Sequence, residues 1–99
     1  MANIKQYRAD QLHFDYKNPR LVEFQITPKT SEAEIINILW DAMAVNEIVM
    51  SILAHGFFEN EAMYAVREQD VLVIVEGNRR LAAVKAILNP DIINNSGMN

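Results

Sequence analysis

The sequence contains no cysteine, no long apolar run and fewer basic than acidic side chains. Without cysteine there can be no disulfide, no thiolate nucleophile and no zinc site built on sulfur. The longest strongly apolar run is the segment 71–75, much shorter than the roughly 20 residues that a membrane span needs. The opening segment, MANIKQYRADQ, has no apolar stretch of the kind found in signal peptides. We therefore expect a cytoplasmic protein with no membrane partner.

The chain carries 9 basic and 13 acidic side chains, a formal net charge of −4. Neutralisation of phosphates by Lys and Arg supplies most of the non-specific affinity for nucleic acids. A general DNA-coating role for these residues alone is therefore disfavoured. A small phosphate site made from a few well-placed groups is still compatible with this charge.

A length of 99 residues, with 51% apolar and 22% charged side chains, is typical of one small globular domain. We predict that this domain covers residues 1–90. Residues 91–99 would be a flexible tail or the end of a piece cut from a longer chain.

Patterning predicts an α+β fold in which a small mixed sheet is flanked by helices. Ser31 and Glu34 have capping-box spacing ahead of a helix with apolar residues at helical intervals, and Asn46 and Gly56 would cap the two ends of a second helix. The remaining expected elements are a strand at 11–14, an extended piece at 21–26 after a turn at Asn18-Pro19-Arg20, strands at 62–67 and 71–75 joined by a tight connection, and a helix at 79–88. The segment 71–75 is apolar throughout, which is typical of a strand buried on both faces.

The strand-to-helix corner EGNRR is the main candidate site. The first N–H groups of a helix have no partner within it and attract anions. Gly77 allows close backbone approach, and Asn78 is a candidate N-cap. Arg79 and Arg80 add permanent charges whose forked donors fit phosphate oxygens. Glu76 could hold a metal ion, activate a nucleophile or orient an arginine.

The simpler interpretation of this corner is a turn with a solvated rim. Gly-Asn after a strand is a common turn, and arginines in the first turn of a helix are often only solvated. Because arginine there also opposes the helix dipole, at a cost of a few tenths of a kcal/mol, the placement calls for a reason.

The segment EGNRRLAAVKAIL resembles the box of the ParB/sulfiredoxin superfamily, in which a D/E-G-x-R-R-like turn precedes an Ala-rich helix. The resemblance covers about residues 10–90, and other matches follow in the same order: Asn18-Pro19-Arg20, Leu39, Ser51-Ile52, Gly56 and Val66-Arg67. It identifies the chain as similar to the ParB-like N-terminal domain, also described as a ParB-like nuclease domain. In that superfamily the box binds nucleotide phosphates; ParB proteins hydrolyse CTP and load onto DNA, and some relatives phosphorylate free serine with ATP or ADP.

The resemblance implies roles for six residues. Gly77, Asn78, Arg79 and Arg80 would contact phosphates, with Arg20 beside them. Glu76 would be the catalytic carboxylate, and the cofactor would be Mg²⁺ with CTP or ATP. The metal ligands are not identified by the sequence.

The sequence departs from the family pattern at several places. Sulfiredoxin chemistry is excluded because it uses a cysteine in the same turn. Ala82 stands where chromosome-partitioning ParB proteins have an arginine, and the Gln-Pro expected after Gly56 is missing. The helical DNA-reading region of ParB has no counterpart here. CTP specificity and centromere reading therefore do not follow from the resemblance.

Two functions of different classes remain open. The first is a nucleotide-binding domain with NTP hydrolysis, phosphoryl transfer or nuclease activity. The second is a non-catalytic adaptor that contacts DNA or a protein within a longer plasmid- or chromosome-partition-like or phage protein, with DNA bound through a region after residue 99. The oligomeric state is not defined by the sequence.

Other candidate residues are interpreted as structural. His13 and His55 have no ligand at metal spacing, and Trp40 belongs to an apolar helical stripe. The acidic residues Glu59, Glu61, Glu68 and Asp70 would form a solvated rim. Phe57-Phe58 would close the preceding helix or form a partner surface.

The charge makes a prediction about DNA. The chain should bind duplex DNA weakly, because its acidic side chains outnumber the basic ones, and the remaining affinity should fall steeply as salt is raised because it depends on contacts of Lys and Arg with phosphates. Fluorescence anisotropy across a salt series measures this. Tight binding at about 200 mM salt would contradict the prediction.

Overall fold

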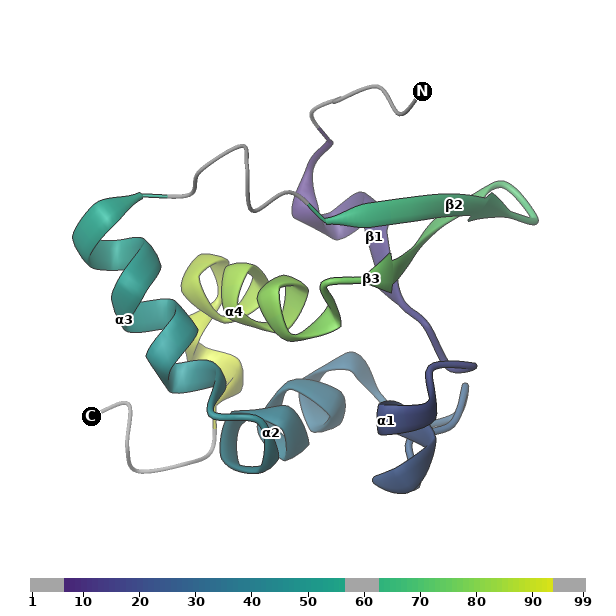
Figure 1. Cartoon of the computed structure of the whole chain (residues 1–99), viewed down its shortest axis with the longest axis horizontal. Helices are drawn as coiled ribbons and strands as arrows, with labels where there is room; N and C mark the ends of the chain where they lie inside the picture. The colour runs from purple at the N-terminus through teal and green to yellow at the C-terminus, as the bar shows by residue number, and fades with distance from the viewer. Residues whose placement is uncertain (1–6, 57–62, 94–99) are drawn as a thin grey trace.

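The structure is a computed structural model that describes residues 7–56 and 63–93. Its elements, in chain order, are η1 (Ala9–Gln11), β1 (Leu12–Phe14), α1 (Pro19–Glu23), α2 (Glu32–Ala42), α3 (Val45–His55), β2 (Tyr64–Glu68), β3 (Val71–Glu76), α4 (Asn78–Leu88) and η3 (Pro90–Ile92). The predicted α+β class is confirmed: helices lie beside a small mixed sheet, with α4 between α2, α3 and the strands (Figure 1).

The sheet has the strand order β1-β3-β2, with β1 parallel and β2 antiparallel to β3. Leu12 lies opposite Leu72 and Phe14 opposite Ile74, so these four apolar side chains share the face that packs on the helices. The β2–β3 hairpin closes through Gln69 and Asp70, whose positive φ angles of 50° and 68° are what a type I′ turn requires. The predicted tight connection is confirmed.

The prediction that the apolar strand is buried on both faces is wrong at its ends. Val73 and Ile74 are buried, but Val71 and Val75 are 40% and 36% exposed. Val71 and Val75 alternate with Leu72 and Ile74 along the strand, so they point to the face of the sheet opposite to the core, and they do not belong to the core cluster.

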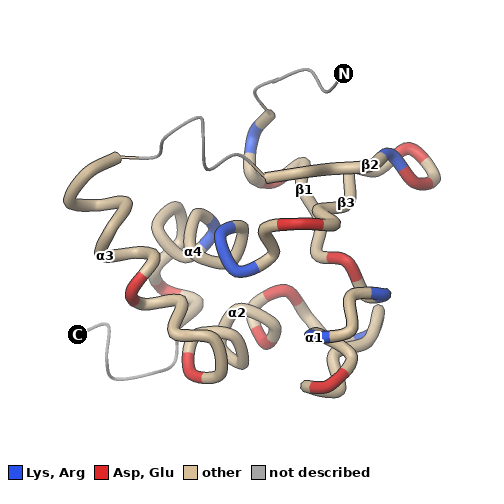
Figure 2. Tube along the Cα trace, viewed as in Figure 1, with Lys and Arg blue, Asp and Glu red and all other residues tan. Residues whose placement is uncertain are grey.

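The hairpin tip carries part of the expected acidic rim (Figure 2). Asp70 is exposed, and the Glu68 carboxylate lies 3.7 Å from the Lys17 Nζ. The other two members of the predicted rim, Glu59 and Glu61, and the Phe57-Phe58 pair lie outside the described residues.

The predicted capping box of α2 is confirmed. Ser31 Oγ accepts a hydrogen bond from the Glu34 N–H at 3.2 Å, and Glu34 Oε1 accepts one from the Ser31 N–H at 3.4 Å. The apolar stripe of the helix then enters the core, where Trp40 is 5% exposed, as predicted.

The prediction of an extended piece at 21–26 is wrong, because the chain forms the one-turn helix α1 there. Asn18 is its N-cap, with Oδ1 accepting from the Arg20 N–H at 2.8 Å, and Pro19 at the first position has its φ already fixed near the helical value. Leu21 is buried by this turn at 1% exposure.

The N-cap of α3 was also predicted wrongly. Ala44, not Asn46, precedes the helix, with φ 51° and ψ 44° in the left-handed region. Gly56 does end α3 with a positive φ of 83°, although its ψ of 176° is extended. In the described part of the chain no helix is by itself long and apolar enough to cross a membrane; α2 and α3 pass that test only as a pair, and they are bent by 92° at their junction.

The alanine-rich side of α4 packs within the core of the protein. Ala82, Ala83 and Ala86 are fully buried within the core cluster. Since α4 packs against both α2 and α3, the alanines let these helices approach closely (Figure 1). The arginine that ParB-like boxes place at the Ala82 position would have no room here.

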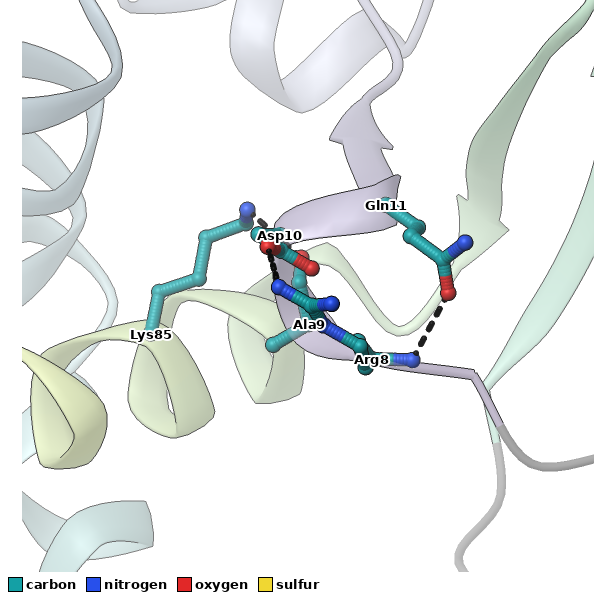
Figure 3. A network of polar contacts seen from close by, with 5 residues as sticks. All are labelled: Arg8, Ala9, Asp10, Gln11 and Lys85. Carbon is teal, nitrogen blue, oxygen red and sulfur yellow. Dashed lines mark hydrogen bonds and ion pairs between the residues drawn. The ribbon is translucent and has the colours of Figure 1, made fainter.

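Lys85 joins the N-terminal segment to α4 (Figure 3). Its Nζ donates to the Ala9 carbonyl at 2.8 Å and lies 3.1 Å from Glu32 Oε2, although the side chain is only 7% exposed. Next to this contact, Arg8 pairs with Asp10, and the Arg8 N–H donates to Gln11 Oε1 at 3.0 Å. These bonds fix the approach of the chain to β1.

The described chain remains packed beyond the predicted domain end at residue 90. Asn37 Nδ2 donates to the Ile92 carbonyl at 2.8 Å, and Ile92 and Ile93 contact the core. Residues 94–99 of the predicted tail lie outside the described residues.

Candidate phosphate-binding pocket

The turn from β3 into α4 is made by Gly77. It is the residue before the helix, with φ 107° and ψ 22°, a conformation that L side chains rarely adopt. A Cβ built at this position would lie 2.8 Å from Cγ and 3.2 Å from Cβ of Met63. Both the backbone angle and the close neighbour therefore require glycine.

Asn78 is not the N-cap that the sequence predicted; it is the first residue of α4 and is 6% exposed. Its Oδ1 accepts from the Asp15 N–H at 3.1 Å, and its Nδ2 donates to the Ile74 carbonyl at 2.9 Å. One side chain thus ties the end of β1, the end of β3 and the start of α4 together. With the side chain engaged in these two bonds, the backbone N–H of Asn78 at the start of α4 is the group best suited to a ligand.

Arg79 reaches the junction between α2 and α3. Its Nε donates to the Met43 carbonyl, and its Nη2 donates to the Ala44 carbonyl at 3.3 Å. The last carbonyls of a helix have no partner within it and form the negative end of its dipole, so a guanidinium is favourable there. Sequence patterning does not reveal this contact, because residues 43 and 79 are brought together only by the tertiary fold.

All six residues predicted for the site lie around one pocket. Its volume is about 350 Å³, at the lower end of the range of small-molecule sites. The lining residues are Asn18, Arg20 and Leu21 around α1, Met43 and Ile48 at the α2–α3 junction, and Glu76, Gly77, Asn78, Arg79 and Arg80 at the corner. In Figure 2 the basic first turn of α4 follows directly on the acidic end of β3.

The pocket has a polar and an apolar wall. Three arginines and one glutamate line it, so the charges nearest to a bound ligand are positive in sum. Leu21, Met43 and Ile48 form the apolar wall, which the sequence analysis missed because these residues come from three separate elements. A ligand with an anionic part and an apolar part matches such a lining.

The two exposed charges of the pocket, Arg20 and Glu76, have no ion-pair partner among the described residues. Arg20 is exposed, and its guanidinium makes no hydrogen bond or ion pair with the residues that the structure describes. Glu76 is also exposed and forms no ion pair within residues 7–56 and 63–93. The sequence left open whether Glu76 only orients an arginine, and no such pair is present in this geometry.

No group of three or more His, Asp or Glu side chains that could hold a metal ion occurs among the described residues, and His13 and His55 lie apart on β1 and α3. Mg²⁺ is usually held by one or two carboxylates together with substrate phosphates, not by an all-protein cage. Glu76 is the carboxylate of the pocket that fits this mode.

A second hollow of about 270 Å³ lies at the hairpin end of the sheet, lined by Tyr7, Gln11, His13, Arg67, Asp70, Val71 and Leu72. It has a single arginine and none of the helix N-terminal N–H groups. The corner pocket is therefore the stronger candidate for an anionic ligand.

Comparisons with known proteins do not identify the chain: no family model, no curated protein and no solved structure matches it. The ParB-like resemblance stays a prediction, and the pocket's own geometry is the basis for the function proposed below.

The Gly77 turn makes a prediction about stability. Gly77→Ala should lower the free energy of unfolding by about 2–4 kcal/mol, from backbone strain plus contact with Met63. Gly56→Ala is the control: that φ is also positive, but no described residue lies within 4 Å of the added Cβ, so backbone strain alone should cost about 1–3 kcal/mol. Urea unfolding measures both. Equal losses in the two variants would show that the contact with Met63 is unimportant.

Proposed function

We propose that the corner pocket binds the phosphates of a nucleotide. The observation that carries this proposal is the convergence of Arg20 from α1 with the EGNRR corner around one pocket. The N-terminus of the eleven-residue helix α4 adds N–H groups and a partial positive charge at the same place.

The apolar wall supports a nucleotide over a free phosphate. Met43 and Ile48, which are half-buried, have no favourable interaction to offer an inorganic anion, but they can cover part of a base or ribose. The pocket is also too small for a length of duplex, and its charge is local, which favours a small ligand over DNA.

Glu76 is the residue on which catalysis depends in this proposal. With Mg²⁺ bound to nucleotide phosphates, its carboxylate would be a ligand of the metal or would accept the proton of an attacking hydroxyl or water. NTP hydrolysis and phosphoryl transfer both fit these roles. The metal would neutralise phosphate charge, and the arginines would hold the phosphates in position.

Nucleotide binding should raise the melting temperature. At a concentration about tenfold above Kd, CTP, ATP or ADP with Mg²⁺ should stabilise the fold by about 1.4 kcal/mol, or about 6–11 °C for a domain of this size. Arg20→Ala should weaken binding about tenfold or more through loss of a charge-assisted hydrogen bond. Arg20 is a better test than Arg79 because its guanidinium has no structural bond to the described residues. Arg67→Ala, on exposed β2, is the control and should bind as the wild type does.

The nucleotide proposal fails if none of the three nucleotides stabilises the wild type. It also fails if Arg20→Ala and Arg67→Ala reduce the stabilisation equally, since the effect would then be one of overall charge.

Glu76→Gln separates the two roles of the carboxylate. If Glu76 binds Mg²⁺, the variant should lose most of the difference between nucleotide affinity with Mg²⁺ and with EDTA, because an amide is a poorer ligand for this ion. If it accepts a proton, the Mg²⁺ dependence of binding should persist while phosphate release from the nucleotide falls at least about 100-fold. Isothermal titration and a phosphate-release assay measure the two quantities. Unchanged values in both would remove Glu76 from the site.

A further inference from the structure

Arg79 belongs to the pocket and to the α2–α3 junction at the same time. Its side chain lines the pocket, while its guanidinium donates to the carbonyls of Met43 and Ala44. Met43 is itself a lining residue, so one arginine connects the polar and apolar walls.

The junction that Arg79 holds is a sharp one. The axes of α2 and α3 are bent by 92°, and the connection passes through Met43 and Ala44, with Ala44 in the left-handed region at φ 51°. A non-glycine residue in that region is unfavourable by about 1–2 kcal/mol, so the surrounding contacts must hold it there. The Ala44 carbonyl accepts bonds from Arg79 Nη2 and from the Glu47 N–H at 3.0 Å, the latter in the first turn of α3.

The guanidinium can serve both partners together. It carries five N–H groups, and two of them are used by the carbonyls of Met43 and Ala44. The remaining groups can donate to an anion in the pocket without breaking these bonds. A bound anion would then restrict the Arg79 side chain, and the restricted side chain would hold the two carbonyls more firmly.

We infer that Arg79 is a positioning residue that couples occupancy of the corner pocket to the order of the α2–α3 junction. This inference has two halves, and only the first, the response of the junction to a ligand, rests on the proposed nucleotide binding. The other half, that Arg79 holds the junction, concerns the protein without ligand. Arg20, in contrast, would act on the ligand without a bond to Met43 or Ala44, since its guanidinium has no partner among the described residues.

Hydrogen exchange of the full chain tests both halves. Without nucleotide, Arg79→Lys should speed exchange of the Glu47 amide and its neighbours in α3 about tenfold, since a lysine cannot reproduce the forked pair of bonds. Amides of the β2–β3 hairpin are the internal control and should keep their rates. If the hairpin exchanges faster by the same factor, the variant has lost only global stability and Arg79 has no particular role at the junction.

Saturating CTP or ATP with Mg²⁺ provides the second comparison. In the wild type the nucleotide should slow exchange in the first turn of α3, and in Arg80→Lys, which keeps the Arg79 bonds, the same slowing should appear once the site is saturated. In Arg79→Lys the nucleotide should bind without slowing these amides.

The coupling would be overturned if the nucleotide slowed exchange of the α3 amides in Arg79→Lys as much as in the wild type. It would also be overturned if the wild type, saturated with nucleotide, showed no slower exchange of these amides. A wild type that binds neither nucleotide removes the proposed function and the coupling together. The comparison without nucleotide still decides whether Arg79 holds the junction, so the two failures are distinguishable.

Discussion

The passage of the chain from β3 into α4 through one residue, Gly77, is the constraint on which the rest of the structure depends. The turn is possible because Gly77 takes φ 107° with Met63 against it, and it is fixed because Asn78 bonds to the backbone at Asp15 and Ile74. Since β1 and β3 are parallel, both strands end at the edge where α4 begins. That edge, beside a helix N-terminus, is where α/β sheets commonly bind ligands.

The two adjacent arginines of the corner follow from helix geometry. Successive residues of an α-helix point about 100° apart, so Arg79 and Arg80 cannot serve the same partner in the same way. Arg79 turns towards the carbonyls of Met43 and Ala44, whereas Arg80 stays half-buried in the lining of the pocket. The unfavourable placement of a cation in the first turn of α4 is thus offset, at least for Arg79, by the negative end of α2.

Sequence patterning predicted the elements whose signals are local. The Ser31 capping box, the Gln69-Asp70 turn and the helix after Gly77 depend on neighbours along the chain, and all three are present. Sequence patterning failed where one residue type fits two different structural roles. Asn18 caps α1, although an Asn-Pro pair is equally typical of a turn, and Asn78 has the right chemistry for a cap but uses it to join two strands.

The candidate site likewise combines residues that the sequence predicts with residues that it does not. Five of the predicted residues were selected because Gly, Asn, Arg and Glu at a strand-to-helix corner have recognisable chemistry, and Arg20 was added by the ParB-like resemblance; all six line one pocket. Sequence patterning could not find the apolar wall of Leu21, Met43 and Ile48, because apolar residues in helices are predicted to be core wherever they occur. Only the bend between α2 and α3 brings Met43 and Ile48 to the pocket.

The charge of the chain and the charge of the pocket have opposite signs, and this difference bears on the ligand. The net charge of −4 acts on any polyanion that extends over the surface, whereas a small anion inside the pocket is affected mainly by the lining, because exposed charges beyond about 10 Å are screened by salt. Within the lining, Glu76 opposes the arginines and would repel a bare phosphate. Under the proposed function, a nucleotide that arrives with Mg²⁺ would bring the positive charge that offsets this repulsion, so Glu76 would be a favourable contact for the complex and an unfavourable one for free phosphate.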